Sequence, residues 1–478
     1  LMTDLTDFLS DGSYRNWLFK NKKHAKINVV ASLGMILLWD IDSGLAQIDK
    51  YLHSDDNYVI AGALLGVGLV NCSVTNDYDP ALTLLSEYIK KEDSSIQIGA
   101  IMGLGIAYAG AQDEQVPIME RLQAIADALT GRSVSELGKP LSQLLVLALS
   151  LIYLGKQEGV EATSEVSKSF SKTMRNYVDI TLLSCAHART GNVLTVQKLL
   201  GHCSQLENAE TSKGSAVLGI PIVAMVEEVG LEMLIRLLKH FLQYGEQKIR
   251  LAVPLALGIL CTSNPKVNVT DTLSRLSHDT DLEVAIAAVF SLGLIGARTN
   301  NAPIAGMLRN LSSFYCKVPG LLFCVQIAQG LVHMGNGLLT LNPYHSDRLF
   351  LLSFVITKTA LAGLVTILHA CLDIKSIILG KYHFVLYYLV LAMKPRMLMT
   401  LDKNLEPILV PVLVGEAVDV AGEVGRPKTI TGFQTHSTPV LLAACEKAEL
   451  ATEKYVPLSP ILEGCVILIE NIEYMEDN

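Results

Sequence analysis

The chain has 478 residues, of which 50% are apolar and 18% are charged, and its formal net charge at pH 7 is −9. Because an acidic chain has no general electrostatic attraction for nucleic acid, this composition argues against a nucleic-acid partner and favours a basic protein partner. The mean hydropathy of +0.38 is high, so insertion into a membrane has to be weighed.

The N-terminal segment begins with Leu1 rather than Met and carries no secretory signal. We expect residues 1–24 to form a helical lead-in to a repeat-like segment that is established by Val30. We also expect the chain to be the C-terminal part of a longer protein.

Pairs of small residues, one position apart, recur in apolar runs from residue 66 to residue 330. The first members of successive pairs lie 35 to 37 residues apart, except for one step of 45 residues. A self-similar period of this length indicates stacked helix pairs, in which each unit packs only on its neighbours. The pairs are Gly66/Gly68, Gly103/Gly105, Ala148/Ser150, Ser184/Ala186, Gly219/Pro221, Ala256/Gly258, Ser291/Gly293 and Ala328/Gly330.

Within each unit an apolar helix alternates with an amphipathic one, as in residues 98–110 and 79–90. A glycine inside a helix costs about 0.8–1 kcal/mol relative to alanine, so repeated glycines must recover this cost through close packing of helix backbones. We therefore predict a mostly α protein, an α-solenoid over residues 25–403 that curls into a toroid. Gly110 and Gly155 are predicted to cap helix C-termini.

Three stretches interrupt the repeat. The 45-residue step from Gly103 to Ala148 is too long for one loop and too short for an additional unit, and residues 205–214 form a polar connector. After Ala328 the pattern fades through residues 362–363 and 384–393, where we expect terminal units with their own caps.

One apolar stretch, residues 349–372, is long enough to cross a bilayer, which requires about 20 apolar residues. Lys358 lies in its middle, and a central lysine costs about 2.5–3.5 kcal/mol on insertion scales. We therefore interpret this stretch as a buried solenoid helix and expect no membrane association.

From about residue 406, short β-branched runs separated by Pro and Gly replace the helical pattern. This change predicts a small β-rich domain over residues 404–478. The predicted strands are 408–414, 417–420, 428–435, 439–443 and 465–470.

Patterns of catalytic or metal-binding residues are missing from the sequence. Gly103 and Gly105 lack the third glycine of a dinucleotide-binding loop, and the nearest His–Cys pairs, at 202–203 and 369–371, lack further ligands. The nine cysteines are scattered without a CxxC pair, so we expect them to be reduced, as in a cytosolic or nuclear protein. We predict a protein that is not an enzyme and has no metal and no cofactor.

The blocks Gly-Ala-Leu-Leu-Gly-Val-Gly at 62–68 and Gly-Ala-Ile-Met-Gly-Leu-Gly at 99–105 resemble the proteasome/cyclosome repeat. This repeat family includes the two largest non-ATPase subunits of the 26S proteasome regulatory particle and one cyclosome subunit. The likeness is to the smaller of those two subunits and runs from about residue 11 to residue 469. The segments that carry it are 31–40, 47–52, 342–348, 428–436, 438–442 and 460–464.

The resemblance implies a non-catalytic scaffold of the regulatory particle base, located in the cytoplasm and nucleus. The partners it implies are the proteasomal ATPase ring subunits, ubiquitin, the ubiquitin-like domains of shuttle receptors, and a proteasome-associated deubiquitinase. Ubiquitin-like domains present a small aliphatic patch with a basic rim, which an acidic helix surface complements. Because each rim ion pair contributes only about 0.2–1 kcal/mol, useful affinity would come from multivalent chains.

The resemblance also implies a ubiquitin-binding site at Glu120 and Asp127, which lie two helical turns apart and share one face. A third acidic position of the family aligns with Gly131 here, so that acid is absent. One repeat is expected to be missing near residues 112–116.

A deubiquitinase-docking site is implied after the first repeat. Ile41, Asp42 and Gln47 match the family pattern there, whereas Ala46 replaces a polar residue. Both implied sites are therefore partial matches.

Two other function classes stay open from the residues alone. A generic HEAT-like solenoid could serve as an adaptor in complexes outside the proteasome, although ordinary HEAT units do not require regular Gly-x-Gly pairs. An enzyme with a buried site is the third possibility, and the lack of a convergent set of polar residues argues against it.

Overall fold

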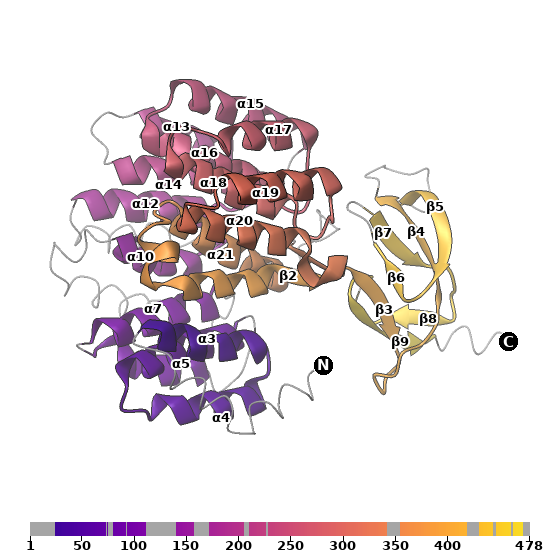
Figure 1. Ribbon diagram of the computed structural model, residues 1–478. Coiled ribbons are helices and arrows are strands. Elements are labelled where there is room, and N and C mark those ends of the chain that lie inside the picture. Colours follow the sequence, from indigo (N-terminus) through magenta and orange to yellow (C-terminus); the bar gives the residue numbers. More distant parts are fainter. Residues whose placement is uncertain are drawn as a thin grey trace. The chain divides into compact units, whose positions relative to one another are not determined.

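The computed structural model describes residues 24–72, 74, 80–91, 93–110, 140–156, 172–204, 210–225, 228–341, 354–417, 430–442, 446–459 and 462–471. Figure 1 shows the helices and strands of the chain, which divides into two compact units. Unit 1 comprises residues 1–260, 275–288 and 354–392, and unit 2 comprises residues 261–274, 289–353 and 393–478.

Unit 1 contains two kinds of helix. The inner helices are α3 (His24–Ile36), α5 (Asn57–Val70), α7 (Ser94–Ala107), α10 (Pro140–Ile152), α12 (Lys172–Ala186), α14 (Glu210–Ala224) and α16 (Gln247–Leu260). The outer helices are α4 (Ile41–Leu52), α6 (Pro80–Ile89), α13 (Val193–Ser204) and α15 (Glu228–Tyr244). Two further helices have residues in both units: α17 (Val267–Leu276), buried along one stripe like the outer helices, and α18 (Leu282–Ile295), buried from Val284 to Ile295 like the inner helices.

The sequence of each helix explains which kind it is. In α5 every residue from Ala61 to Val70 is buried, because this helix is apolar on all sides and packs on neighbours all around. In α4 the buried residues are Gly44, Ile48 and Leu52, spaced four apart along one stripe, and the remaining faces are polar. This alternation confirms the predicted helical solenoid.

Small residues let the inner helices pack backbone against backbone. A Cβ added to Gly34 would lie 2.5 Å from the Cα of Gly66, and one added to Gly105 would lie 2.5 Å from the Cβ of Ala148. Likewise, a Cβ on Gly68 would overlap the backbone of Gly103. The recurring small pairs in this part of the solenoid therefore serve packing.

At their N-terminal ends, successive inner helices are joined by side chains. In each case a residue near the start of one helix donates to a carboxylate at the start of the next, which offsets the charge of that helix end. These pairs are Lys26–Asp56 at 2.6 Å, Asn57–Asp93 at 2.9 Å, Lys213–Glu246 at 2.8 Å and Gln247–Asp281 at 2.7 Å.

At their C-terminal ends, backbone groups make the connection. A turn residue with positive φ follows the inner helix, and its N–H donates to a carbonyl in the last turn of the next inner helix. The donors and acceptors are Gly110–Leu151, Gly155–Cys185, Arg189–Ile222 and Ser263–Leu294, at 2.9 to 3.0 Å. Gly110 and Gly155 were predicted to cap the helices that they follow, but the C-cap of α7 is Tyr108, and both glycines bond instead to the end of the next inner helix.

A late segment of the chain packs against the inner helices of unit 1. We call it the hub, and it consists of α21 (Phe354–Cys371), η3 (Ile377–Lys381) and η4 (His383–Ala392). Helix α21 contacts η4, α7, α10, α14 and α16, and η4 contacts α3, so the hub touches the row of inner helices from its first member to α16. Figure 1 shows α21 in orange beside these purple and magenta helices.

The hub corrects one expectation. Residues 362–363 and 384–393 were predicted to belong to terminal capping units, but α21 and η4, which contain 362–363 and 384–392, pack on inner helices from much earlier in the chain, and Met393 pairs with Leu341 of β1. The buried position predicted for the helix over 349–372 is confirmed for Thr359–Cys371. Within the described ranges, no helix has the length and apolar character needed to cross a bilayer. Closure of the inner helices into a full toroid stays a prediction.

Unit 2 contains α19 (Ala302–Phe314), α20 (Pro319–Val332), η1 (Met334–Gly337) and all nine strands of the described residues. Strands β1 (Leu339–Leu341) and β2 (Met393–Pro395) form a two-stranded sheet. A four-stranded sheet has the order β6-β3-β9-β8, and a three-stranded sheet has the order β5-β4-β7. Their strands are β3 (Met397–Leu401), β4 (Pro411–Ala417), β5 (Ile430–Ser437), β6 (Val440–Leu441), β7 (Glu446–Leu450), β8 (Tyr455–Pro457) and β9 (Cys465–Glu470).

The larger two sheets share one apolar cluster. Its buried members come from alternate positions of the strands, as the two-residue period of a strand requires. They are Leu398, Val410, Val412, Val414, Leu442, Ala448, Val466 and Leu468. A small β-rich region at the C-terminal end was expected, and the predicted boundary at residue 404 stays a prediction, with β2 and β3 lying ahead of it.

Candidate docking surfaces and the polar groups of the hub

The contact between the hub and α12 contains a buried polar pair. The hydroxyl of Tyr177 lies 3.0 Å from Nδ1 of His369 in α21, and both side chains are buried. Burial lowers the pKa of His369 to about 4 and raises that of Tyr177 above its usual value. At neutral pH both groups are uncharged, so this pair has the character of a structural hydrogen bond.

A second polar contact joins the hub to the end of α7. Lys358 of α21 donates through Nζ to the carbonyl of Gly110 at 3.1 Å, and only 7% of the residue is exposed. Burial, with a contribution from the charge of Lys156, lowers the pKa of Lys358 to about 8. The lysine that argued against a membrane span therefore binds a carbonyl of the turn that follows α7.

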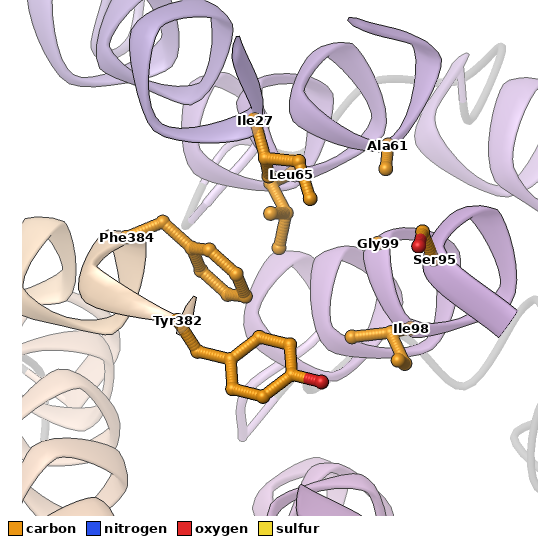
Figure 2. Close-up of a pocket in the computed structure, with 8 residues that line it drawn as sticks. All are labelled: Ile27, Ala61, Leu65, Ser95, Ile98, Gly99, Tyr382 and Phe384. Carbon is orange, nitrogen blue, oxygen red and sulfur yellow. The ribbon is translucent and has the colours of Figure 1, made fainter. Parts of the chain in front are cut away.

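Two aromatic side chains, Phe384 of η4 and Tyr382 between η3 and η4, line a small depression between inner helices. Figure 2 shows Phe384 and Tyr382 pointing toward Leu65 of α5 and Ile98 of α7, with Ile27 of α3 beside them. Ala61, Ser95 and Gly99 complete its lining, which is almost entirely apolar. Because the remaining space is small, this depression is a packing contact of the hub and offers no room for a substrate.

Helix α4 carries the residues that were predicted to dock a deubiquitinase. Asp40 is its N-cap and accepts from the backbone N–H of Ser43 at 3.2 Å, so the start of the helix is fixed. The hydrogen bond from the Ser43 hydroxyl holds the pKa of Asp40 below its usual value. This cap places the following side chains on a stable, solvent-accessible helix.

The three predicted residues of α4 do not form one patch. Asp42 is exposed, whereas Ile41 and Gln47 are half-buried. Asp42 and Gln47 are five positions apart, which corresponds to about 140° around the helix, so they lie on opposite flanks of the buried stripe. Asp42 instead shares its exposed face with Asp49, two turns further along.

An exposed aromatic residue beside this helix was not among the predicted site residues. Trp39 is 52% exposed and adopts a positive φ of 68° immediately before the N-cap Asp40. It lies close in sequence to Ile41 and Asp42, so the start of α4 combines an aromatic, an aliphatic and an acidic side chain. Its position in the segment 31–40, which carries the family likeness, was the signal in the sequence that could have identified it.

The predicted ubiquitin-binding residues Glu120 and Asp127 lie outside the described residues, as does Gly131. Their assignment therefore rests on the sequence alone.

The described part of the chain contains no group of three or more His, Cys, Asp or Glu side chains placed to hold a metal ion. Its cysteines are free thiols, most of them buried, and burial raises the pKa of Cys185 to about 12. Raised pKa values disfavour the reactive thiolate, so these buried thiols have the properties of core residues.

Comparison with known proteins identifies relatives along the whole chain. A family model described as the C-terminal part of the 26S proteasome non-ATPase regulatory subunit RPN1 matches residues 421–474. The chain is 63% identical to the 26S proteasome non-ATPase regulatory subunit 2 homolog A of Arabidopsis thaliana, over 100% of this chain and 57% of that protein. It is 46% identical to subunit 2 of Dictyostelium discoideum, over 95% of this chain and 54% of that protein. Identity to the regulatory subunit rpn1 of Schizosaccharomyces pombe is 44%, over 98% of this chain and 56% of that protein.

The chain thus spans little more than half the length of these relatives. The alignment with the Arabidopsis protein covers 510 positions, whereas this chain has 478 residues. That relative therefore contains residues within the aligned stretch that this chain lacks. The alignment length agrees with a missing repeat but does not locate it, so its predicted position near residues 112–116 stays a prediction.

Proposed function

The chain belongs to the family of 26S proteasome non-ATPase regulatory subunit 2, or RPN1, and on this premise we propose that it is a non-catalytic scaffold of the regulatory particle base. In this role it acts in ubiquitin-dependent protein degradation in the cytoplasm and nucleus. It binds proteasomal ATPase ring subunits and presents docking sites for ubiquitin, shuttle receptors and a deubiquitinase. The observation that carries the proposal is the high identity to subunit 2 over the whole chain.

The packing of unit 1 supports a scaffold role. Its inner helices and hub are held by close backbone contacts and buried polar pairs, while outer helices such as α4 direct charged faces to solvent. A closely packed interior with charged, solvent-exposed outer faces suits a protein that holds several partners at once.

We assign deubiquitinase docking to the start of α4, with Trp39 and Ile41 as apolar anchors and Asp42 as an acidic neighbour. Exposed tryptophan is the residue type most enriched among energetically important contacts. Gln47 lies on the other flank of the helix and would contact the partner only at the edge of the interface.

We assign ubiquitin binding to Glu120 and Asp127 from the sequence resemblance. Changing both to arginine should abolish binding of ubiquitin chains to the isolated protein while leaving its helical circular dichroism unchanged. Unaltered binding would remove this assignment without affecting the family membership.

Affinity purification of the tagged chain tests the scaffold role directly. Proteasomal ATPase subunits are expected to co-purify, and mass spectrometry of the eluate is the measurement. Recovery of the soluble, folded chain without any ATPase subunit would contradict the proposal.

The α4 assignment has its own test. Trp39→Ala and Asp42→Arg should each weaken binding of the proteasome-associated deubiquitinase by at least fivefold, measured with purified proteins. The matched control is Glu87→Arg, which makes the same change of charge on the exposed face of the neighbouring outer helix α6. Equal loss in the control would show a general charge effect and would rule out a site at the start of α4.

A further inference from the structure

Strand β5 is exposed on both faces, unlike its partner strand. Of its eight residues only Ile430 is buried, and Phe433 is 58% exposed. Val412 and Val414 of β4 are buried in the shared cluster, but the residues paired with them, His436 and Gln434, are exposed. The apolar core therefore ends at β4, and β5 projects beyond it.

The outer edge of β5 is unpaired within the described residues. The sheet order is β5-β4-β7, and no described strand pairs with the other side of β5. An edge strand with free N–H and C=O groups is a template for another strand, which proteins usually block with charged residues or proline. β5 contains neither, since its sequence is Ile-Thr-Gly-Phe-Gln-Thr-His-Ser.

The hydrogen-bond pattern identifies the residues that face outward. Thr438 N–H donates to the carbonyl of Val410 at 3.0 Å, so these two residues form a hydrogen-bonded pair. In the neighbouring pair, Ser437 with Pro411, the proline has no N–H to donate. Antiparallel pairs alternate between bonded and non-bonded types, so Ser437 and Thr435 belong to the non-bonded type. Their N–H and C=O groups point away from β4.

The charge of this region selects among possible partner strands. From Met393 to the end, the sequence has seven lysines and arginines against thirteen aspartates and glutamates. One of these acids, Glu416 of β4, is paired with Thr431 of β5, and β7 beyond β4 carries Glu446 and Glu449 against one lysine, Lys447. A basic segment is therefore attracted to this surface, and an acidic one is repelled.

We propose that β5 docks an extended, basic segment of a partner protein by strand addition, with Thr435 and Ser437 making the backbone hydrogen bonds. Such a segment would alternate β-branched residues with polar ones and carry lysine or arginine at its ends. Phe433 lies just beyond a register shift opposite β4 and provides an exposed aromatic surface for its side chains. None of its residues belongs to the docking sites proposed above.

A synthetic peptide tests the proposal on the 478-residue chain. The probe has alternating valine and threonine with a lysine at each end and a fluorescent label, and fluorescence anisotropy measures its binding. Thr435→Pro removes an outward N–H without removing a bond to β4, so it should weaken binding at least tenfold. The matched control Thr435→Val keeps the N–H and should bind as the unchanged chain does.

Three further measurements keep the test decisive if Thr435→Pro alters the fold. Methylating alternate peptide nitrogens should weaken binding to the unchanged chain at least tenfold, and glutamate ends in place of lysine should do the same. Hydrogen exchange at Thr435 and Ser437 should be fast in the free chain and slow after peptide binding.

Several outcomes would overturn the proposal. Binding that is insensitive to both Thr435→Pro and peptide methylation would exclude strand addition. Slow exchange at Thr435 and Ser437 in the free chain would show that the edge is already covered. A self-association seen by sedimentation, lost in Thr435→Pro while the peptide fails to bind, would make a second copy of this chain the occupant.

Discussion

Helix α5 and strand β5 differ sharply in how many of their residues are buried. Eleven of the 14 residues of α5 are buried, including both of its small-pair glycines, Gly66 and Gly68. In β5 one residue of eight is buried. Both segments are short, and both lie beside a well-packed apolar cluster.

The difference arises because a helix and a strand find the partners for their backbone hydrogen bonds in different places. A helix makes its hydrogen bonds internally, so neighbouring helices can approach on every side and small residues shorten the distance further. A strand satisfies half of its backbone groups through each neighbour, so the last strand of a sheet keeps an open side. The expected effects of substitutions in the two regions therefore differ in size.

The largest effect is expected for Gly68→Val in α5. The added side chain would overlap the backbone of Gly103, which cannot move without displacing α7. We expect a loss of about 3 kcal/mol or more in the free energy of unfolding, measured with urea. Gly330→Ala is the matched control, because it is also in a small pair but has nothing within 4 Å of an added Cβ. It should cause no loss, and equal losses would refute the packing explanation.

Acidification should destabilise the interior of unit 1 through His369. Its pKa is about 6.5 when unfolded and about 4 when folded, so between these values the unfolded chain binds more protons. The contribution of neutral His369 is complete above pH 6.5 and is lost as the pH falls toward 4. We expect a loss of about 2 kcal/mol at pH 5, measured by urea unfolding. His369→Leu should remove this part of the pH dependence, and a profile unchanged by that substitution would contradict the assignment.

Tyr177→Phe should destabilise the same contact by about 1.5 kcal/mol, because it deprives a buried imidazole nitrogen of its partner. The double variant with His369→Leu should lose less than the sum of the two single variants, since neither polar group is then left behind. Additive losses would show that the two side chains are not coupled.

Asp93→Ala should cost about 1 kcal/mol. Asp93 caps α7 by accepting from the N–H of Ser95 at 2.8 Å, and it also accepts from Asn57 of α5 at 2.9 Å. Asp93→Asn keeps a capping oxygen and should recover most of the loss. Equal stability of all three proteins in urea unfolding would rule out a role for this connection between repeats.

The smallest effect is expected at Phe433 of β5. Because this side chain is already 58% exposed, Phe433→Ser should change the free energy of unfolding by less than about 0.5 kcal/mol. A loss comparable to that of Gly68→Val would show that Phe433 is buried in solution, and the contrast between the two regions would fail.

Much of the helical architecture could be predicted from sequence because its signal is local and periodic. The pairs Gly66/Gly68 and Gly103/Gly105 identified the inner helices, and the stripe in 79–90 identified an outer one. The hub could not be predicted in the same way, because Lys358 meets Gly110 and His369 meets Tyr177 across 248 and 192 residues. No spacing rule in a single sequence links residues that far apart.

The strands and the docking residues illustrate two further limits. The segments 408–414, 428–435 and 465–470 were recognised from β-branched residues, whereas β7 was missed because Glu-Lys-Ala-Glu-Leu favours a helix and pairing with β4 overrides that preference. Ile41, Asp42 and Gln47 were grouped from the family resemblance alone, but the separation of Asp42 from Gln47 around α4 depends on which stripe of the helix is buried. Trp39 could not be identified as a docking residue from the sequence, because its side-chain exposure cannot be read from the composition.

The hub also sets the order in which the protein can mature on the ribosome. Residues 261–353 are synthesised after α16 and before the hub, which takes roughly 5–20 s at 5–20 residues per second. During that interval Phe384 and Tyr382 have not yet been synthesised, so the apolar side chains of Ile27, Leu65 and Ile98 are not covered by them. Nascent chains stalled before Phe354 are therefore expected to be protease-sensitive and to need chaperones, whereas chains stalled well beyond Ala392 should resist digestion.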